Sequence, residues 1–150
     1  MLLLTPRAGS PAGRTPAANT AKHLPGTLYL VLLAYLYLIR FDLFLADGNF
    51  AKLHDRVRNY PTRKHAADPR AAERICTAVD LASICYWKRV LCLQRSASTA
   101  CLLKHFGVLA EMAIGVQQMP FKAHAWVEVD GRVVGDKPYM REMYAVLDRC

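Results

Sequence analysis

At 150 residues the chain is long enough for one compact domain and short for two. An apolar fraction of 53% allows a sizeable core, and a formal net charge of +8 favours an acidic partner or surface. The sequence has neither zinc-finger spacing nor interleaved aromatic and basic residues, so we predict no nucleic-acid partner. Five cysteines without a C-x-x-C pair argue against a disulfide framework. They favour a cytoplasmic protein in which most cysteines are buried packing residues.

The first 26 residues are rich in Pro, Gly, Ala, Ser and Thr and show no periodicity. We therefore predict a tail at residues 1–26 and one domain at residues 27–150. The opening Met-Leu-Leu-Leu is too short for the apolar part of a signal peptide.

The most apolar run, Leu28 to Ile39, predicts a helix that continues to Ala46 and stops at residues 47–49. Its uncharged part is shorter than the roughly 20 residues that cross a bilayer. We favour a buried or partner-facing helix. Membrane association through residues 28–46 is the alternative, because tyrosines in the run suit a membrane surface.

Residues 52–74 carry a basic excess and predict a short helix, a turn at Pro61 and a second helix that starts after Asp68-Pro69. We interpret the charges as a solvated helix face, with a docking surface for an acidic partner as the alternative. Helical spacing continues over residues 71–86, and another helix runs from Cys92 to Phe106 and ends at Gly107.

Strand patterns follow this helix. Residues 108–116 predict a strand that breaks at Gly115, and residues 121–129 predict one with alternating faces, His124 lying on the less apolar face. Asp130-Gly131 predicts a hairpin, with a return strand at residues 132–134. A short helix after Pro138 is expected to complete the domain.

Cys92, His124 and Asp136 come in the order that a thiol-nucleophile enzyme needs. A cysteine in the first turn of a helix has its thiolate favoured by the helix dipole, a histidine can carry the proton, and an acid can orient the histidine. Each residue also has a simpler interpretation: a packing thiol, a surface imidazole and a loop carboxylate. The three could in principle bind a metal, but no close-spaced ligand pair accompanies them. We therefore predict no metal and no cofactor.

The segments C-L-Q-R-S at 92–96 and A-H-A-W-V-E at 123–128 resemble the leader peptidases of lasso-peptide biosynthesis, with similarity over residues 28–148. The resemblance implies an α+β fold with a papain/transglutaminase-like cysteine-protease core, N-terminal helices and a small antiparallel sheet. It implies a cysteine endopeptidase that cuts the leader from a ribosomally made precursor peptide. The freed core amine is then closed into a macrolactam by a separate ATP-dependent cyclase, a further expected partner.

The resemblance matches Cys92 to the nucleophile, His124 to the base and Asp136 to the orienting acid. Four further positions match the same motifs and are predicted to support the site: Arg95, Ser96, Trp126 and Glu128. Two features depart from the family pattern: S-A-S-T follows Arg95 in place of leucine-rich sequence, and Gly135 replaces a residue such as asparagine.

Fused family members carry a leader-recognition domain that residues 1–26 are too short to form. The resemblance therefore implies the split form, which needs a separate leader-recognition protein. Two other functions stay open. One is transglutaminase-type acyl transfer by the same triad, and the other is an inactive scaffold that binds precursor and cyclase.

Overall fold

The structure is a computed structural model that describes residues 25–63 and 70–150. Helices come first within these residues: α1 (Thr27–Ala46), α2 (Phe50–Arg58), α3 (Ala71–Ile84) and α4 (Cys92–His105). The sheet and a short helix follow: β1 (Ala110–Gln117), β2 (Lys122–Val129), β3 (Arg132–Val134), α5 (Met140–Met143) and β4 (Ala145–Arg149). This order confirms the predicted α+β class. The predicted tail falls almost wholly outside the described residues. Asp68 and Pro69 lie outside them too, but α3 begins at Ala71, so the predicted helix after these two residues is confirmed.

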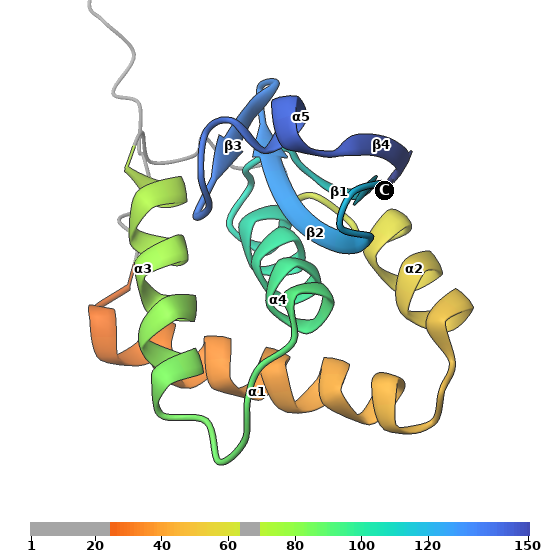
Figure 1. The fold of residues 1–150 in the computed structure, drawn as a ribbon. Helices are drawn as coiled ribbons and strands as arrows, with labels where there is room; N and C mark the ends of the chain where they lie inside the picture. Colours follow the sequence, from red (N-terminus) through yellow and green to blue (C-terminus); the bar gives the residue numbers. More distant parts are fainter. Residues whose placement is uncertain (1–24, 64–69) are drawn as a thin grey trace, which may run out of the picture.

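Helix α4 lies at the centre of the molecule, between α3 and α2, with α1 crossing below it and the sheet above (Figure 1). Its side chains are therefore buried on all sides from Ser96 to Lys104. Small residues make this central position sterically feasible, and the hydroxyls among them find acceptors inside the protein. Ser98 Oγ donates to the Gln94 carbonyl at 2.8 Å, and Thr99 Oγ1 donates to the Arg95 carbonyl at 2.9 Å. The S-A-S-T segment thus permits the close packing that surrounds the helix.

Helix α1 buries one stripe and exposes another. Leu30, Ala34, Leu38 and Phe41, spaced three and four residues apart, lie in the core against α3 and α4. The opposite side exposes leucines, of which Leu36 is 60% accessible. By length and composition alone this 20-residue helix could cross a membrane. Its buried stripe nevertheless makes it part of the domain core, as the sequence predicted.

The four strands form an antiparallel sheet in the order β3-β2-β1-β4. The predicted hairpin between β2 and β3 is confirmed. Asp130 and Gly131 both have positive φ angles, 49° and 74°, and Val129 pairs with Arg132. Two such residues give the turn that best matches the twist of a two-residue hairpin. The hairpin carries the chain back towards the start of β2 and delivers Asp136 there.

The predicted break at Gly115 is wrong, because β1 continues through this residue to Gln117. A Cβ atom at Gly115 would lie 2.8 Å from Cη2 of Trp126 and 2.9 Å from the Ala145 carbonyl oxygen. The glycine therefore serves close packing between β1, the Trp126 ring and β4. The pairing between β1 and β4 shifts register beside it, between Ile114 and Gly115.

The prediction for the C-terminal segment is only partly right. The short helix exists as α5, but the chain then enters a strand, β4, that the sequence did not reveal. β4 pairs with β1, and the pairing extends to Cys150, whose N–H donates to the Met112 carbonyl at 2.9 Å. The segment after β3 therefore completes the sheet and covers its outer face.

Candidate active site

Cys92 is exposed and is the first residue of α4. Leu91 before it is extended, with ψ of 151°, and its N–H donates to Gln94 Oε1 at 3.3 Å, which fixes where the helix begins. The Gln94 side chain is fully buried, and its amide donates to the Leu38 carbonyl of α1 at 3.0 Å. The thiol therefore stands at the positive end of a helix that is anchored in the core.

His124 lies in β2, and its Nε2 is 2.8 Å from Oδ2 of Asp136. The other carboxylate oxygen of Asp136 accepts the Lys137 N–H at 2.8 Å, so both oxygens are held. The two side chains are 24% and 17% exposed. Because Nε2 faces Asp136, the ring nitrogen left for the Cys92 thiol is Nδ1. The structure thus brings the three sequence-predicted residues together, while their catalytic roles remain a prediction.

Electrostatics distinguish Cys92 from the other cysteines. A hydrogen bond with His124 lowers the pKa of Cys92 against the opposing effect of partial burial, helped by the backbone of Ala125. The same bond raises the pKa of His124, again against partial burial, and Asp136 reinforces the increase. By contrast, burial raises the pKa of Cys76 and Cys150 to about 11. Opposite shifts on two bonded groups favour a thiolate–imidazolium pair, the reactive form of a cysteine nucleophile.

Two of the predicted supporting residues connect α4 to the rest of the site. Ser96 Oγ donates to the Ala125 carbonyl at 2.8 Å and so joins the nucleophile helix to the histidine strand. Arg95 Nε donates to Asp80 Oδ1 at 3.0 Å, and its Nη2 donates to the Gly135 carbonyl at 2.6 Å. These bonds join α4 to β2, to α3 and to the loop that carries Asp136.

The other two supporting residues form a buried cluster behind His124. Trp126 stacks with His124 at a centroid distance of 6.4 Å, and its Nε1 donates to Glu128 at 2.9 Å. The Glu128 side chain is 2% exposed and is paired with Arg141 and Arg149. The cluster therefore fastens α5 and β4 onto the outer face of β2.

Several site residues escaped the sequence reasoning: Asp80, Gln94, Arg141, Tyr144 and Arg149. Tyr144 lies against the His124 ring with centroids 5.5 Å apart, and together with Trp126 it covers that ring. An aromatic residue in a segment predicted as helix gave no signal of this contact. Gln94 could have been found, because it stands at the third helical position, where a glutamine often caps.

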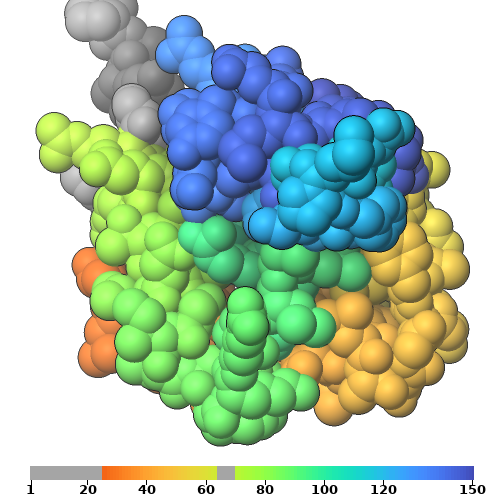
Figure 2. All heavy atoms as spheres, in the orientation of Figure 1, coloured from red at the N-terminus to blue at the C-terminus, as the bar shows by residue number. Residues whose placement is uncertain are grey.

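The surface around the site is built from distant parts of the chain. Residues 135–145 and the β1–β2 turn lie next to each other above α4, and the α3–α4 connection projects below them (Figure 2).

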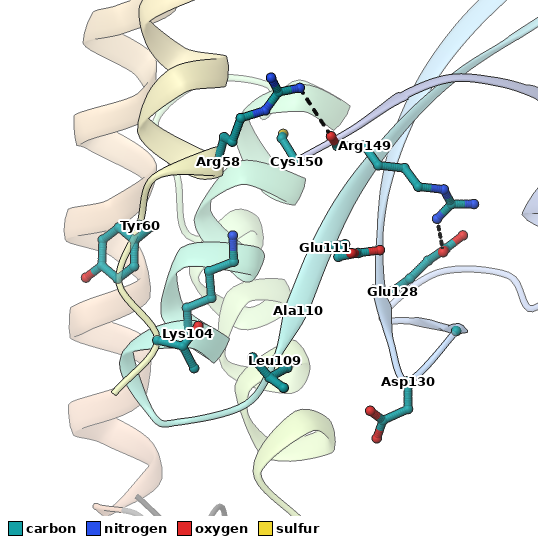
Figure 3. A pocket seen from close by; sticks show the side chains of 12 residues that line it. Arg58, Tyr60, Lys104, Leu109, Ala110, Glu111, Glu128, Asp130, Arg149 and Cys150 are labelled. Atoms are coloured by element: carbon teal, nitrogen blue, oxygen red, sulfur yellow. Dashed lines mark hydrogen bonds and ion pairs between the residues drawn. The ribbon is translucent and has the colours of Figure 1, made fainter. Parts of the chain in front are cut away.

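A cavity of about 590 Å³ lies at the far end of β2 from His124, beside Glu128 (Figure 3). Three of its cationic lining residues already have partners inside the protein. Lys104 Nζ donates to the Val57 carbonyl at 2.8 Å, Arg149 pairs with Glu128, and Arg58 contacts the Arg149 carbonyl. We assign this cavity no part in the chemistry at Cys92.

The chain is similar to a known protein and matches a known family. The microcin J25-processing protein McjB of Escherichia coli is 39% identical to the chain over 56 residues, which are 37% of this chain and 27% of that protein. The chain thus covers little more than a quarter of that relative's length. No solved structure matches. The family model of the transglutaminase-like superfamily matches residues 35–149. The sequence resemblance is therefore confirmed, and the chain belongs to the transglutaminase-like superfamily.

Proposed function

We propose that this protein is a cysteine endopeptidase that removes the leader from a ribosomally made lasso-peptide precursor. One observation carries the proposal: the His124 imidazole lies between the Cys92 thiol and the Asp136 carboxylate. Cys92 is the first residue of a buried helix. The similarity to a protein named for processing microcin J25 supports the choice of substrate.

In the first half of the reaction, the Cys92 thiolate attacks the carbonyl carbon at the leader–core junction. The N–H of Cys92 lies in the first turn of α4, where no intrahelical acceptor exists, and it can donate to the oxyanion that forms. The imidazolium of His124 then gives its proton to the leaving nitrogen. The C–N bond breaks, the core peptide leaves with a free amine, and the leader stays as a thioester.

In the second half, neutral His124 takes a proton from water, and the hydroxide attacks the thioester carbon. The C–S bond breaks, the leader leaves with a new carboxylate, and the thiolate–imidazolium pair returns. Asp136 supports each imidazolium and keeps the ring oriented through Nε2. One peptide bond and one water are consumed, and no redox partner is needed.

We further propose a cytoplasmic setting in which a separate leader-recognition protein presents the precursor. In this scheme the ATP-dependent lasso cyclase uses the freed core amine. The resemblance of residues 92–96 and 123–128 to the split leader peptidases supports these partners.

The test is mass spectrometry of precursor incubated with a leader-recognition protein and either the wild type or Cys92→Ala. Wild type should release leader and core at their hydrolysed masses, and Cys92→Ala should release neither while keeping its circular dichroism. Cys85→Ala is the matched control, because Cys85 is exposed too, and it should cleave normally.

A repeat with added primary amine separates peptidase from acyl transfer. An amine adduct on the new leader C-terminus as the main product would favour transfer. Cleavage that survives in Cys92→Ala would refute the nucleophile. Lack of cleavage by the folded wild type with its precursor would favour the scaffold.

A further inference from the structure

Asp136 lies in a segment with little regular structure of its own. It follows β3, a three-residue edge strand that pairs only with β2 among the described strands. Gly135 then turns the chain with a positive φ of 66°, a conformation that favours glycine and tolerates asparagine. Strand pairing has ended before the acid is reached, so other contacts must fix the distance between Asp136 and His124.

Arg95 makes one of these contacts. Its Nη2 donates at 2.6 Å to the Gly135 carbonyl, which belongs to the peptide unit that joins Gly135 to Asp136. Arg95 stands three residues after Cys92 on α4, about one helical turn from the nucleophile. The guanidinium thus links the helix that carries the thiol directly to the backbone of the acid.

Asp80 holds the guanidinium in place. Its Oδ1 accepts from Arg95 Nε at 3.0 Å and also from Nη2, so two donors of the planar group are fixed at once. Asp80 is on α3, four residues after Cys76, and a Cβ atom at Gly135 would lie 3.0 Å from Cys76 Sγ. One face of α3 therefore supports the loop from below and also anchors the arginine that holds it.

We propose that Asp80 and Arg95 are positioning residues that set the Asp136 carboxylate against His124. This inference rests on the function proposed above, because it assigns the pair to the same site. Asp80 is 48% exposed and Arg95 is 30% exposed, and an ion pair so accessible to water contributes little to global stability. The effect of the pair should therefore appear in the chemistry of Cys92 and His124 and hardly in unfolding.

Alkylation of Cys92 by iodoacetamide tests this without any substrate, because only the thiolate reacts. Trypsin releases residues 90–95 as a peptide that contains Cys92 alone, so mass spectrometry can follow this thiol separately from Cys85. The titratable or aromatic groups beside His124 are Cys92, Asp136, Tyr144 and Trp126. Asp80→Ala and Asp80→Asn should move the Cys92 alkylation profile to higher pH, and the rate near pH 7 should fall by at least about threefold.

The decisive comparison is made in an Asp136→Ala background. Asp136→Ala alone should move the Cys92 alkylation profile to higher pH, and by more than Asp80→Ala does. Once Asp136 is absent, Asp80→Ala should add no further shift, because the loop no longer carries an acid to position. Arg95→Lys keeps the charge but loses the two-donor geometry, so it should behave like Asp80→Ala.

Asp148→Ala is the matched control, since it removes a half-exposed carboxylate that pairs with Arg58 and His54 elsewhere in the protein. It should leave the Cys92 profile unchanged. With precursor, Asp80→Asn should lower kcat about tenfold and leave KM unchanged, as expected when catalytic groups are displaced slightly.

An unshifted profile in both folded Asp80 variants would overturn the proposal. So would a shift that persists in full after Asp136 is removed, because the pair would then act on Cys92 by another route. Alkylation does not depend on precursor cleavage, so it decides the role of Asp80 and Arg95 even if the proposed peptidase activity is absent.

Discussion

Replacing Glu128 by glutamine should reveal how strongly one buried carboxylate holds the C-terminal segment. Glu128 is 2% exposed, accepts from Trp126 Nε1 at 2.9 Å and Arg141 Nε at 2.7 Å, and pairs with Arg149. Glutamine keeps the shape and an acceptor for Trp126 but removes the charge. The change therefore isolates the electrostatic part of the cluster.

The magnitude follows from the pKa of this carboxyl. Hydrogen bonds from Arg141, then from Trp126 and Arg149, lower it from 4.5 to about 2 despite burial. Each pKa unit corresponds to about 1.4 kcal/mol, so the charge stabilises the fold by roughly 3 kcal/mol near pH 7. Arg141 and Arg149 are 45% and 36% exposed, and screening by water reduces this to about 2 kcal/mol.

The stabilisation by the Glu128 charge depends on pH. Because the folded pKa is depressed, the stabilisation is fully present above the unfolded pKa of 4.5 and is lost as the pH falls towards 2. We expect Glu128→Gln to lower the free energy of unfolding by about 2 kcal/mol near pH 7, with the difference from wild type roughly halved near pH 3. Urea unfolding at several pH values measures it, and the other carboxylates cancel in the difference.

Glu111→Gln is the matched control. Glu111 is exposed and lies opposite Glu128 in the register of β1 and β2. This substitution should change stability by less than about 0.5 kcal/mol. A Glu128→Gln effect that is equally large at both pH values would show that packing, and not charge, holds the cluster together.

Three further results are expected. Gly115→Ala should lower the free energy of unfolding by about 1–3 kcal/mol, measured in urea, because its Cβ meets the rigid Trp126 ring; an unchanged midpoint would contradict this contact. Gln94→Ala should cost about 1–3 kcal/mol in the same measurement, since it removes a buried side-chain donor to the Leu38 carbonyl and the acceptor for the Leu91 N–H, and a loss below about 0.5 kcal/mol would argue against these bonds. Detergent-free cell fractionation should recover the protein in the soluble fraction, because the inner stripe of α1 packs in the core. Recovery in the membrane pellet would instead favour membrane contact, provided that the double variant Leu32→Gln/Leu36→Gln returns to the soluble fraction.

Local signals explain why much of the fold could be predicted. Asp47 and Gly107 follow the ends of α1 and α4, as expected of residues that terminate helices. Asp130-Gly131 forms a hairpin turn through its own backbone angles alone. The motifs around Cys92 and His124 placed both residues on the correct elements.

Contacts between distant segments explain what the sequence could not reveal. Gly115 looks like a break until the Trp126 ring is placed against it. Asp80 resembles any polar residue on a helix surface, and its role appears only when Arg95 and Gly135 meet beside it. β4 lacks a clear alternation, and its register is set by β1, about thirty residues earlier.

The late position of β4 also affects how the protein can be made. β1 is an open sheet edge until residues 145–150 emerge from the ribosome, and an unpaired edge is a site for aggregation. The β1 edge can therefore be covered by β4 only after these residues have been synthesised.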